Sequence, residues 1–154
     1  MKSFTDLIND CLSEVKELFP WDLSEKLEAG ERPMLLDIRE PYEFDAMRIE
    51  DSVCVPRGIL ETACDWGYEE TVPELVQARD KEIIIICRSG NRSIVAAHVM
   101  QLMGYQDVLS LKTGLRGWND FEQPLVNEQG AVDIDNADEY FMSLVKSHQL
   151  KPKD

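Results

Sequence analysis

The stretch KEIIIICRSGNRS, Lys81–Ser93, is the most informative part of this chain for predicting its fold. Its four consecutive isoleucines, Ile83–Ile86, place apolar side chains on both faces of an extended segment. Strands of this kind lie in the middle of parallel sheets that are covered on both sides. The apolar positions from Asn91 to Met103 then suit a helix packed against such a sheet, with Gly104 as its C-terminal stop.

The rest of the chain repeats this alternation of short strands and helices. Three more apolar runs predict strands, at residues 34–38, 52–56 and 107–111. Residues 21–30 and two pieces of 59–80 are helical in tendency, whereas residues 112–125 form a turn-rich segment. We therefore expect an α/β fold, with a mostly parallel central sheet and helices on both of its faces.

Extra helices are expected at both ends of the chain. Apolar residues from Phe4 to Phe19 recur at three- and four-residue steps, which indicates one helix face that ends at Pro20. Near the other end, the apolar side of a last helix is expected at Tyr140, Phe141, Leu144, Val145 and His148. We divide the chain into an N-terminal helical extension at 1–20, a central domain at 21–127 and a C-terminal helical extension at 128–154.

Composition narrows the possible partners. The net charge of −14 repels phosphate backbones, so we expect no nucleic-acid binding. No apolar run approaches the roughly 20 residues needed to cross a bilayer, so we expect no membrane partner. The first residues lack the basic segment and apolar core of a signal peptide, which favours a cytoplasmic protein.

The cysteines and histidines favour free thiols over a metal site. Cys11, Cys54, Cys64 and Cys87 form no C-x-x-C pair, and the chain has only two histidines. This supply of ligands does not support zinc, so we predict no metal site. Free thiols fit a reducing compartment.

Cys87 stands where an α/β sheet places its ligands. In open α/β sheets the binding crevice lies outside the carboxyl ends of the strands, and Cys87 ends the predicted central strand. Backbone amides of the following loop and the helix N-terminus form an anion-binding concavity. Arg88 and Arg92 add positive charge, and Gly90 permits a tight turn. These features favour a thiolate, so Cys87 is the candidate nucleophile.

The segment CRSGNRS, Cys87–Ser93, resembles the active-site loop of the rhodanese family of sulfurtransferases. Upstream, DIREPYEF (37–44) resembles the family's Asp-x-Arg-Glu-Pro-x-Glu-Phe segment, and VPRG (55–58) follows in place of Ile-Pro-x-Gly. Downstream, residues 104–126 resemble the family's closing segment. The chain departs from the family at 47–51, where Gly-His-Ile-x-Gly is usual, and at Thr113-Gly114, where Gly-Gly is usual. The resemblance covers residues 21–126 and implies that 21–127 is a rhodanese domain.

The resemblance also implies a mechanism. The Cys87 thiolate takes sulfur from a small anionic donor such as thiosulfate, and its persulfide passes the sulfur to a thiol acceptor. Arg88 and Arg92 would hold the sulfonate of the donor, because guanidinium groups suit oxyanions. Ser89, Gly90, Asn91 and Ser93 would act through backbone amides and loop shape. No metal or organic cofactor is implied.

Several side chains near the site have two open roles. Arg92 either binds the anion or braces the loop by pairing with an acid. Arg88 either binds the anion or points outward and sets substrate choice. Asp37 and Arg39 either border the pocket or form an internal ion pair, and Arg57 is a further candidate for the pocket wall.

Three other functions compete with thiosulfate-type sulfur transfer. In a sulfur relay, a sulfur-carrier protein would replace the small donor or acceptor. A cysteine phosphatase would use a similar cradle, but its loop has one more residue between cysteine and arginine than residues 88–91 provide here. The shorter loop fits a sulfur atom better than a tetrahedral phosphate. A non-catalytic binding module is disfavoured because Cys87 is present.

Overall fold

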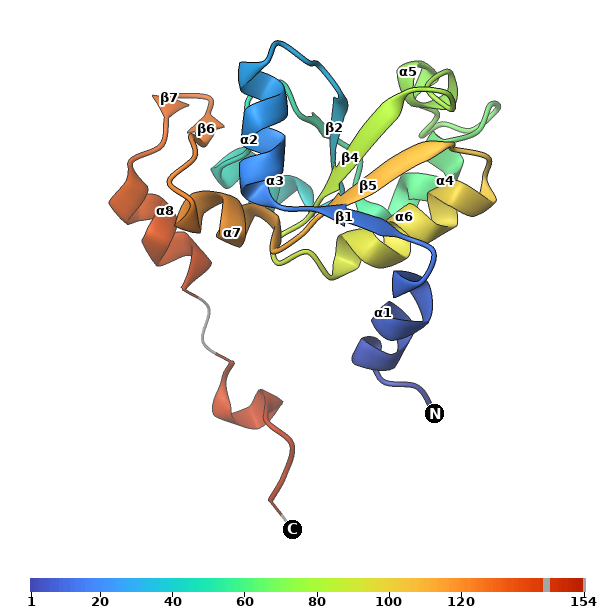
Figure 1. The fold of residues 1–154 in the computed structure, drawn as a ribbon. Helices are drawn as coiled ribbons and strands as arrows, with labels where there is room; N and C mark the ends of the chain where they lie inside the picture. Colours follow the sequence, from blue (N-terminus) through green and yellow to red (C-terminus); the bar gives the residue numbers. More distant parts are fainter. Residues whose placement is uncertain (143–144, 154) are drawn as a thin grey trace.

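The computed structural model describes residues 1–142 and 145–153. A five-stranded parallel sheet with strand order β1-β5-β4-β2-β3 forms its centre (Figure 1). Its strands are β1 (Lys16–Leu18), β2 (Met34–Asp37), β3 (Val53–Cys54), β4 (Glu82–Ile86) and β5 (Asp107–Leu111). The expected α/β fold with a parallel central sheet is confirmed.

Strand β4 lies in the middle of the sheet, between β5 and β2. All four isoleucines, Ile83–Ile86, are fully buried. Ile83 and Ile85 join the core on one face, whereas Ile84 and Ile86 join the core on the other. Burial of each isoleucine side chain contributes about 1.5–3 kcal/mol, which accounts for the central place of this strand.

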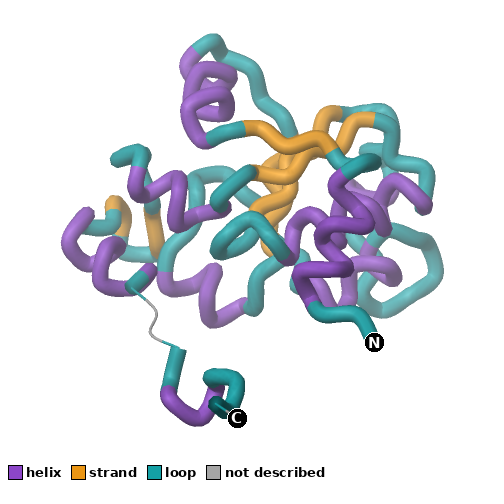
Figure 2. The backbone as a smooth tube through the Cα atoms, turned by 60° about the horizontal axis from the view of Figure 1, so that its bottom comes forward, coloured by secondary structure: helices purple, strands orange, loops and turns teal. Residues whose placement is uncertain are grey.

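Helices cover both faces of the sheet (Figure 2). One core includes residues of α1 (Phe4–Leu12), α4 (Leu60–Ala63), α5 (Pro73–Val76) and α6 (Arg92–Leu102). The other core includes residues of α2 (Pro20–Glu28), α7 (Gly114–Asp120) and α8 (Ile134–Phe141). The short helix α3 (Pro41–Ala46) follows β2, and the 3-10 turns are η1 (Arg57–Ile59) and η2 (Ser147–Gln149).

A second, two-stranded antiparallel sheet joins β6 (Val126–Asn127) to β7 (Gly130–Ala131). Arg48 forms an isolated antiparallel bridge with Val126, which ties this small sheet to the segment after α3. No helix among residues 1–142 and 145–153 is long and apolar enough to cross a membrane.

The N-terminal segment differs from the single helix that its periodicity predicts. Helix α1 ends at Leu12, and Lys16–Leu18 instead form the edge strand β1, paired in parallel with β5. Pro20 does not end a helix but begins α2, at the first helical position, where its missing N–H needs no partner. Pairing with β5 outweighed the helical periodicity of these residues. Three residues are too few to show a strand pattern of their own.

The turn-rich segment at 112–125 contains a helix that the glycines concealed. Helix α7 spans Gly114–Asp120 and begins after Thr113. Thr113 and Gly114 have positive φ angles of 66° and 60°, which turn the chain into the helix. Its side chains Leu115 and Trp118 are buried against the sheet, and this burial outweighs the poor helix propensity of glycine.

The last helix is shorter than expected. Helix α8 ends at Phe141, and Met142 has left the helical conformation. Leu144 lies outside the described residues. Val145 is exposed, and His148 lies in the separate turn η2. A helix through His148 was therefore wrong, although Tyr140 and Phe141 lie on the helix as predicted.

Candidate active site

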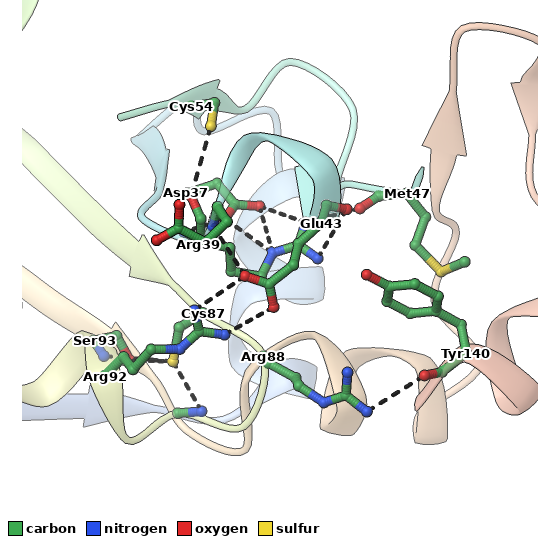
Figure 3. A network of polar contacts seen from close by, with 12 residues as sticks. Asp37, Arg39, Glu43, Met47, Cys54, Cys87, Arg88, Arg92, Ser93 and Tyr140 are labelled. Carbon is green, nitrogen blue, oxygen red and sulfur yellow. Dashed lines mark hydrogen bonds and ion pairs between the residues drawn. The ribbon is translucent and has the colours of Figure 1, made fainter. Parts of the chain in front are cut away.

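Cys87 directly follows β4 at the carboxyl edge of the sheet, and residues 88–91 lead from it into α6 (Figure 3). Its Sγ accepts hydrogen bonds from the backbone N–H groups of Gly90, at 3.1 Å, and Ser93, at 3.4 Å. Cys87 itself is fully buried. Two amides that converge on one sulfur form a site that favours a negative charge there.

Two buried serines continue this site away from the loop. Ser93 Oγ lies 3.3 Å from Cys87 Sγ and 2.7 Å from Ser110 Oγ on β5. A hydroxyl either accepts from a thiol or donates to a thiolate, so Ser93 satisfies the sulfur in both protonation states. Ser110 gives the Ser93 hydroxyl its second partner.

Two glycines allow the loop to pack closely against the N-terminus of α7. Gly90 has a φ of 84°, and a Cβ there would lie 2.7 Å from Thr113 N. A Cβ on Gly114 would lie 2.5 Å from Cys87 O. The N–H groups of Leu115 and Arg116 donate to Cys87 O and Arg88 O, each at 2.9 Å. The N-terminus of α7 therefore holds the loop after Cys87 in place.

Arg92 forms a two-point ion pair with Glu43 of α3, with nitrogen–oxygen distances of 3.0 and 3.1 Å. Burial of the Glu43 carboxyl opposes its ionisation, but hydrogen bonds from Arg92 and from the backbone of Glu40 outweigh it. The pKa of Glu43 therefore lies below its usual value. Arg92 could either bind the anion or brace the loop by pairing with an acid. The structure shows the pairing with an acid.

Asp37 and Arg39 form a fully buried ion pair at the end of β2, with Nη2 and Oδ2 2.8 Å apart. Arg39 also donates to Met47 O at 2.8 Å and Glu43 O at 3.3 Å. These contacts join the end of β2 to α3 and to Met47, the residue that directly follows α3 (Figure 3). The pair is placed as an internal brace and not on an open pocket wall.

Arg88 points away from this network, toward α8. Its Nη2 donates to Tyr140 O at 3.3 Å, and its guanidinium lies 5.7 Å from the ring centroids of both Tyr140 and Phe141 (Figure 3). No salt bridge involves Arg88 within residues 1–142 and 145–153. Among these described residues, its positive charge therefore has no acidic partner within salt-bridge distance.

The remaining candidates lie farther from the sulfur or outside the loop. Ser89 and Asn91 are exposed on the loop surface. Arg57 pairs with Glu61 at 2.7 Å, and its backbone N–H donates to Ile38 O. These contacts of Arg57 involve no loop residue. The structure therefore does not bring Arg57 to the Cys87 sulfur through any described polar contact.

The other cysteines lack the surroundings of a nucleophile. All four cysteines are free, and Cys11 and Cys64 are buried. Burial and the nearby Asp37 carboxylate raise the pKa of Cys54 to about 11. Within the described part of the chain, no cluster of three or more His, Cys, Asp or Glu side chains could hold a metal ion.

Sequence reasoning missed Ser110, Gly114 and Tyr140 as neighbours of the site. Ser110 and Tyr140 are distant from Cys87 in the sequence, and no local pattern links them to it. Gly114 had a signal, because a glycine in a turn-rich segment can mark a place where two backbones approach closely. Only the packing of β5, α7 and α8 around β4 brings the three together.

Comparison with known proteins agrees with this geometry. Residues 20–121 match the model of the rhodanese-like domain. A sulfurtransferase of Allochromatium vinosum is 30% identical over 116 residues, which are 75% of this chain and 99% of that protein. YrkF of Bacillus subtilis, provisionally named a sulfur carrier protein, is 31% identical over 106 residues, 69% of this chain and 52% of that protein.

This chain also matches one part of a longer relative. The probable adenylyltransferase/sulfurtransferase MoeZ of Mycobacterium tuberculosis is 27% identical over 105 residues, 68% of this chain and 25% of that protein. The chain therefore spans about a quarter of the length of MoeZ.

Solved structures show the same fold. A Rhodopseudomonas palustris protein of unknown function, described as a possible tyrosine phosphatase, has a TM-score of 0.74 and 26% identity over 80% of this chain and 94% of its own. A human single-domain sulfurtransferase has a TM-score of 0.58 and 23% identity, covering 69% of this chain and 96% of its own. The family model and the full-length relative together show that this chain belongs to the rhodanese-like family of sulfurtransferases.

Proposed function

We propose that this protein transfers sulfane sulfur through a persulfide on Cys87. The observation that carries this proposal is the contact of Cys87 Sγ with the N–H groups of Gly90 and Ser93. Amides aimed at a sulfur stabilise a thiolate before the reaction and the charged terminal sulfur after it. A thiolate held in this way is a nucleophile without a separate general base.

The first half-reaction uses an anionic donor such as thiosulfate. The Cys87 thiolate attacks the outer sulfur, a new S–S bond forms, and the S–S bond of thiosulfate breaks with its electron pair leaving on sulfite. The charge is unchanged in sum, because a thiolate and thiosulfate become a persulfide anion and sulfite. Arg88, which has no acidic partner among the described salt bridges, supplies the cation for the sulfonate.

The second half-reaction passes the outer sulfur to a thiophile. A thiolate or cyanide attacks that sulfur, the Cys87–S bond breaks, and the Cys87 thiolate is restored as the leaving group. Because Cys87 is fully buried, both reactants reach it only when side chains at the mouth of the site move.

A protein sulfur relay is the second candidate function. The similarity to YrkF, provisionally named a sulfur carrier protein, and to MoeZ favours a protein thiol as donor or acceptor. The net charge of −14 would suit a basic partner. A small donor and a protein acceptor use the same persulfide, so the two functions differ only in the partner of each half-reaction.

Mass measurement of the intact protein tests the proposal. After incubation with thiosulfate, the protein should gain the mass of one sulfur atom, and cyanide should remove it. Cys87→Ser should gain nothing, whereas Cys54→Ser, which removes a thiol with a raised pKa, should gain sulfur normally. A Cys87→Ser protein that still gains sulfur would exclude Cys87 as the carrier. Turnover of aryl phosphates without any persulfide would instead indicate that the protein is a cysteine phosphatase.

A further inference from the structure

Helix α8 lies beyond residues 20–121, which match the rhodanese-like domain, and yet it packs firmly onto that domain. Asp133 caps the helix by accepting from the N–H of Asp135 at 2.9 Å. Phe141 is buried in the core that lies under β4 and α7. Asn119 of α7 donates to Asp138 of α8 at 2.6 Å. The helix is thus fixed relative to the active-site loop.

The last turn of α8 contacts the catalytic loop through Arg88. The guanidinium lies 5.7 Å from the Tyr140 ring and 5.7 Å from the Phe141 ring, and these rings meet edge to face at 90°. Its Nη2 also donates to Tyr140 O. The backbone of Arg88 is held separately, because its carbonyl accepts from the N–H of Arg116. Both ends of this flexible side chain are therefore restrained.

Three other arginines near the site have acidic partners, whereas Arg88 has none among the described salt bridges. Arg92 pairs with Glu43, Arg39 with Asp37 and Arg57 with Glu61. Arg88 instead contacts a neutral carbonyl and two aromatic rings, which attract its cation but do not neutralise it. A guanidinium has five N–H donors, and one of the donors of Arg88 is engaged in a described hydrogen bond.

Tyr140 also faces the site with its phenol. Figure 3 shows its ring beside Arg88, with the hydroxyl directed toward the side where Glu43 lies. Burial raises the pKa of this phenol, and the charges that act on it include those of Arg39, Glu43 and Arg88. The phenol therefore lies within the influence of charges from the loop, from the segment that follows β2 and from α3.

We propose that Tyr140 and Phe141 are positioning residues that hold Arg88 ready for the anionic group of the sulfur donor. This inference rests on the proposed function and names what α8 adds to it. A restrained guanidinium loses less conformational entropy when an oxyanion binds, and its planar fork suits a sulfonate. The site then selects donors with an anionic group next to the transferable sulfur over neutral sulfane donors.

Kinetics with two donors test this role. The measurement compares thiosulfate with the neutral donor dimethyl trisulfide in the wild type and in Tyr140→Leu, which keeps bulk but removes the aromatic face. The KM for thiosulfate should rise about three- to tenfold with little change in kcat, the range expected for a partly buried cation–π contact. The values for dimethyl trisulfide should not change. Tyr140→Phe, which keeps the ring, should restore the wild-type KM.

A double-mutant cycle links the effect to Arg88. Arg88→Gln should raise the same KM at least as much, and adding Tyr140→Leu should then change nothing further. Phe141→Leu gives a second variant that preserves an apolar core residue. Glu139→Gln, on an exposed part of the same helix, is the control and should behave as wild type. Thermal unfolding of each variant confirms that it is folded.

Thiosulfate binding to Cys87→Ser separates this inference from the proposed function, because binding needs no sulfur transfer. Calorimetry should show weaker binding when Tyr140→Leu or Arg88→Gln is added. If the wild type forms no persulfide but these variants still weaken binding, the proposed function fails and the positioning role stands. If persulfide forms but Tyr140→Leu affects both donors equally, or neither, the positioning role is overturned and the sulfur transfer stands.

Discussion

Ser93 Oγ lies 2.7 Å from Ser110 Oγ, and this pair connects β5 to the sulfur of Cys87, 3.3 Å from the Ser93 hydroxyl. Both serines are fully buried. Ser110 thus contacts the same hydroxyl that contacts the Cys87 sulfur.

Removing the Ser93 hydroxyl should slow sulfur transfer. Ser93→Ala keeps the backbone N–H but deletes the side-chain contact to the sulfur, and a hydrogen bond to a charged group is worth about 1.5–3 kcal/mol. We expect kcat/KM for thiosulfate to fall at least about tenfold. Ser110→Ala should cause a smaller loss. The exposed Ser89→Ala is the control, and an equal loss in it would contradict the specific role of Ser93.

Gly90 should not tolerate a side chain. Its φ of 84° disfavours any residue with a Cβ, and that Cβ would approach Thr113 N to 2.7 Å. Gly90→Ala should therefore move the loop, lower the free energy of unfolding by more than about 1 kcal/mol and abolish most of the transfer activity.

Gly58 provides the matched control for this change. A Cβ there meets nothing within 4 Å, so Gly58→Ala should retain stability and activity. Urea unfolding and the persulfide assay measure both quantities. Similar losses in the two variants would show that the close approach of Gly90 to Thr113 is unimportant.

The Glu43–Arg92 pair should make stability depend on pH. The pKa of Glu43 is lowered in the folded state, so its ionised form favours folding. This contribution is present above the usual glutamate pKa of about 4.3 and is lost as the pH falls through the lowered pKa. The difference in free energy of unfolding between wild type and Glu43→Gln should be largest near neutral pH and disappear in acid.

Chemical denaturation at a series of pH values checks this dependence. The exposed Glu74→Gln is a suitable control, because its carboxyl is in no described salt bridge. A difference between wild type and Glu43→Gln that stays constant down to strong acid would refute the linkage.

Cys54 should react slowly with thiol reagents at neutral pH. Burial and the Asp37 carboxylate raise its pKa to about 11, so only a minute fraction is thiolate at pH 7. In Cys87→Ser, the alkylation rate of Cys54, followed by peptide mass mapping, should rise about tenfold for each pH unit up to that value. The unfolded chain is the control, in which the thiol should titrate near about 8.5. A rate plateau near pH 8 in the folded protein would contradict the raised pKa.

The main elements of the fold could be predicted because their patterns are local. The run Ile83–Ile86 is apolar at every position, which suits only a strand covered on both faces. Strand β1 could not be predicted in this way. Its residues, Lys16–Leu18, take their conformation from pairing with β5, and no pattern in three residues records a partner more than 90 positions away.

The residue pattern around Cys87 was enough to predict a buried strand that leads to this cysteine, followed by a loop with a glycine and two arginines. The partner of each arginine follows only from how the elements pack in three dimensions. Arg92 meets Glu43, which is 49 positions away, and Arg88 meets Tyr140, which is 52 positions away. The physical reason is that the charge and shape of a side chain are local properties, whereas its partner depends on which helices the packed sheet brings to the same edge.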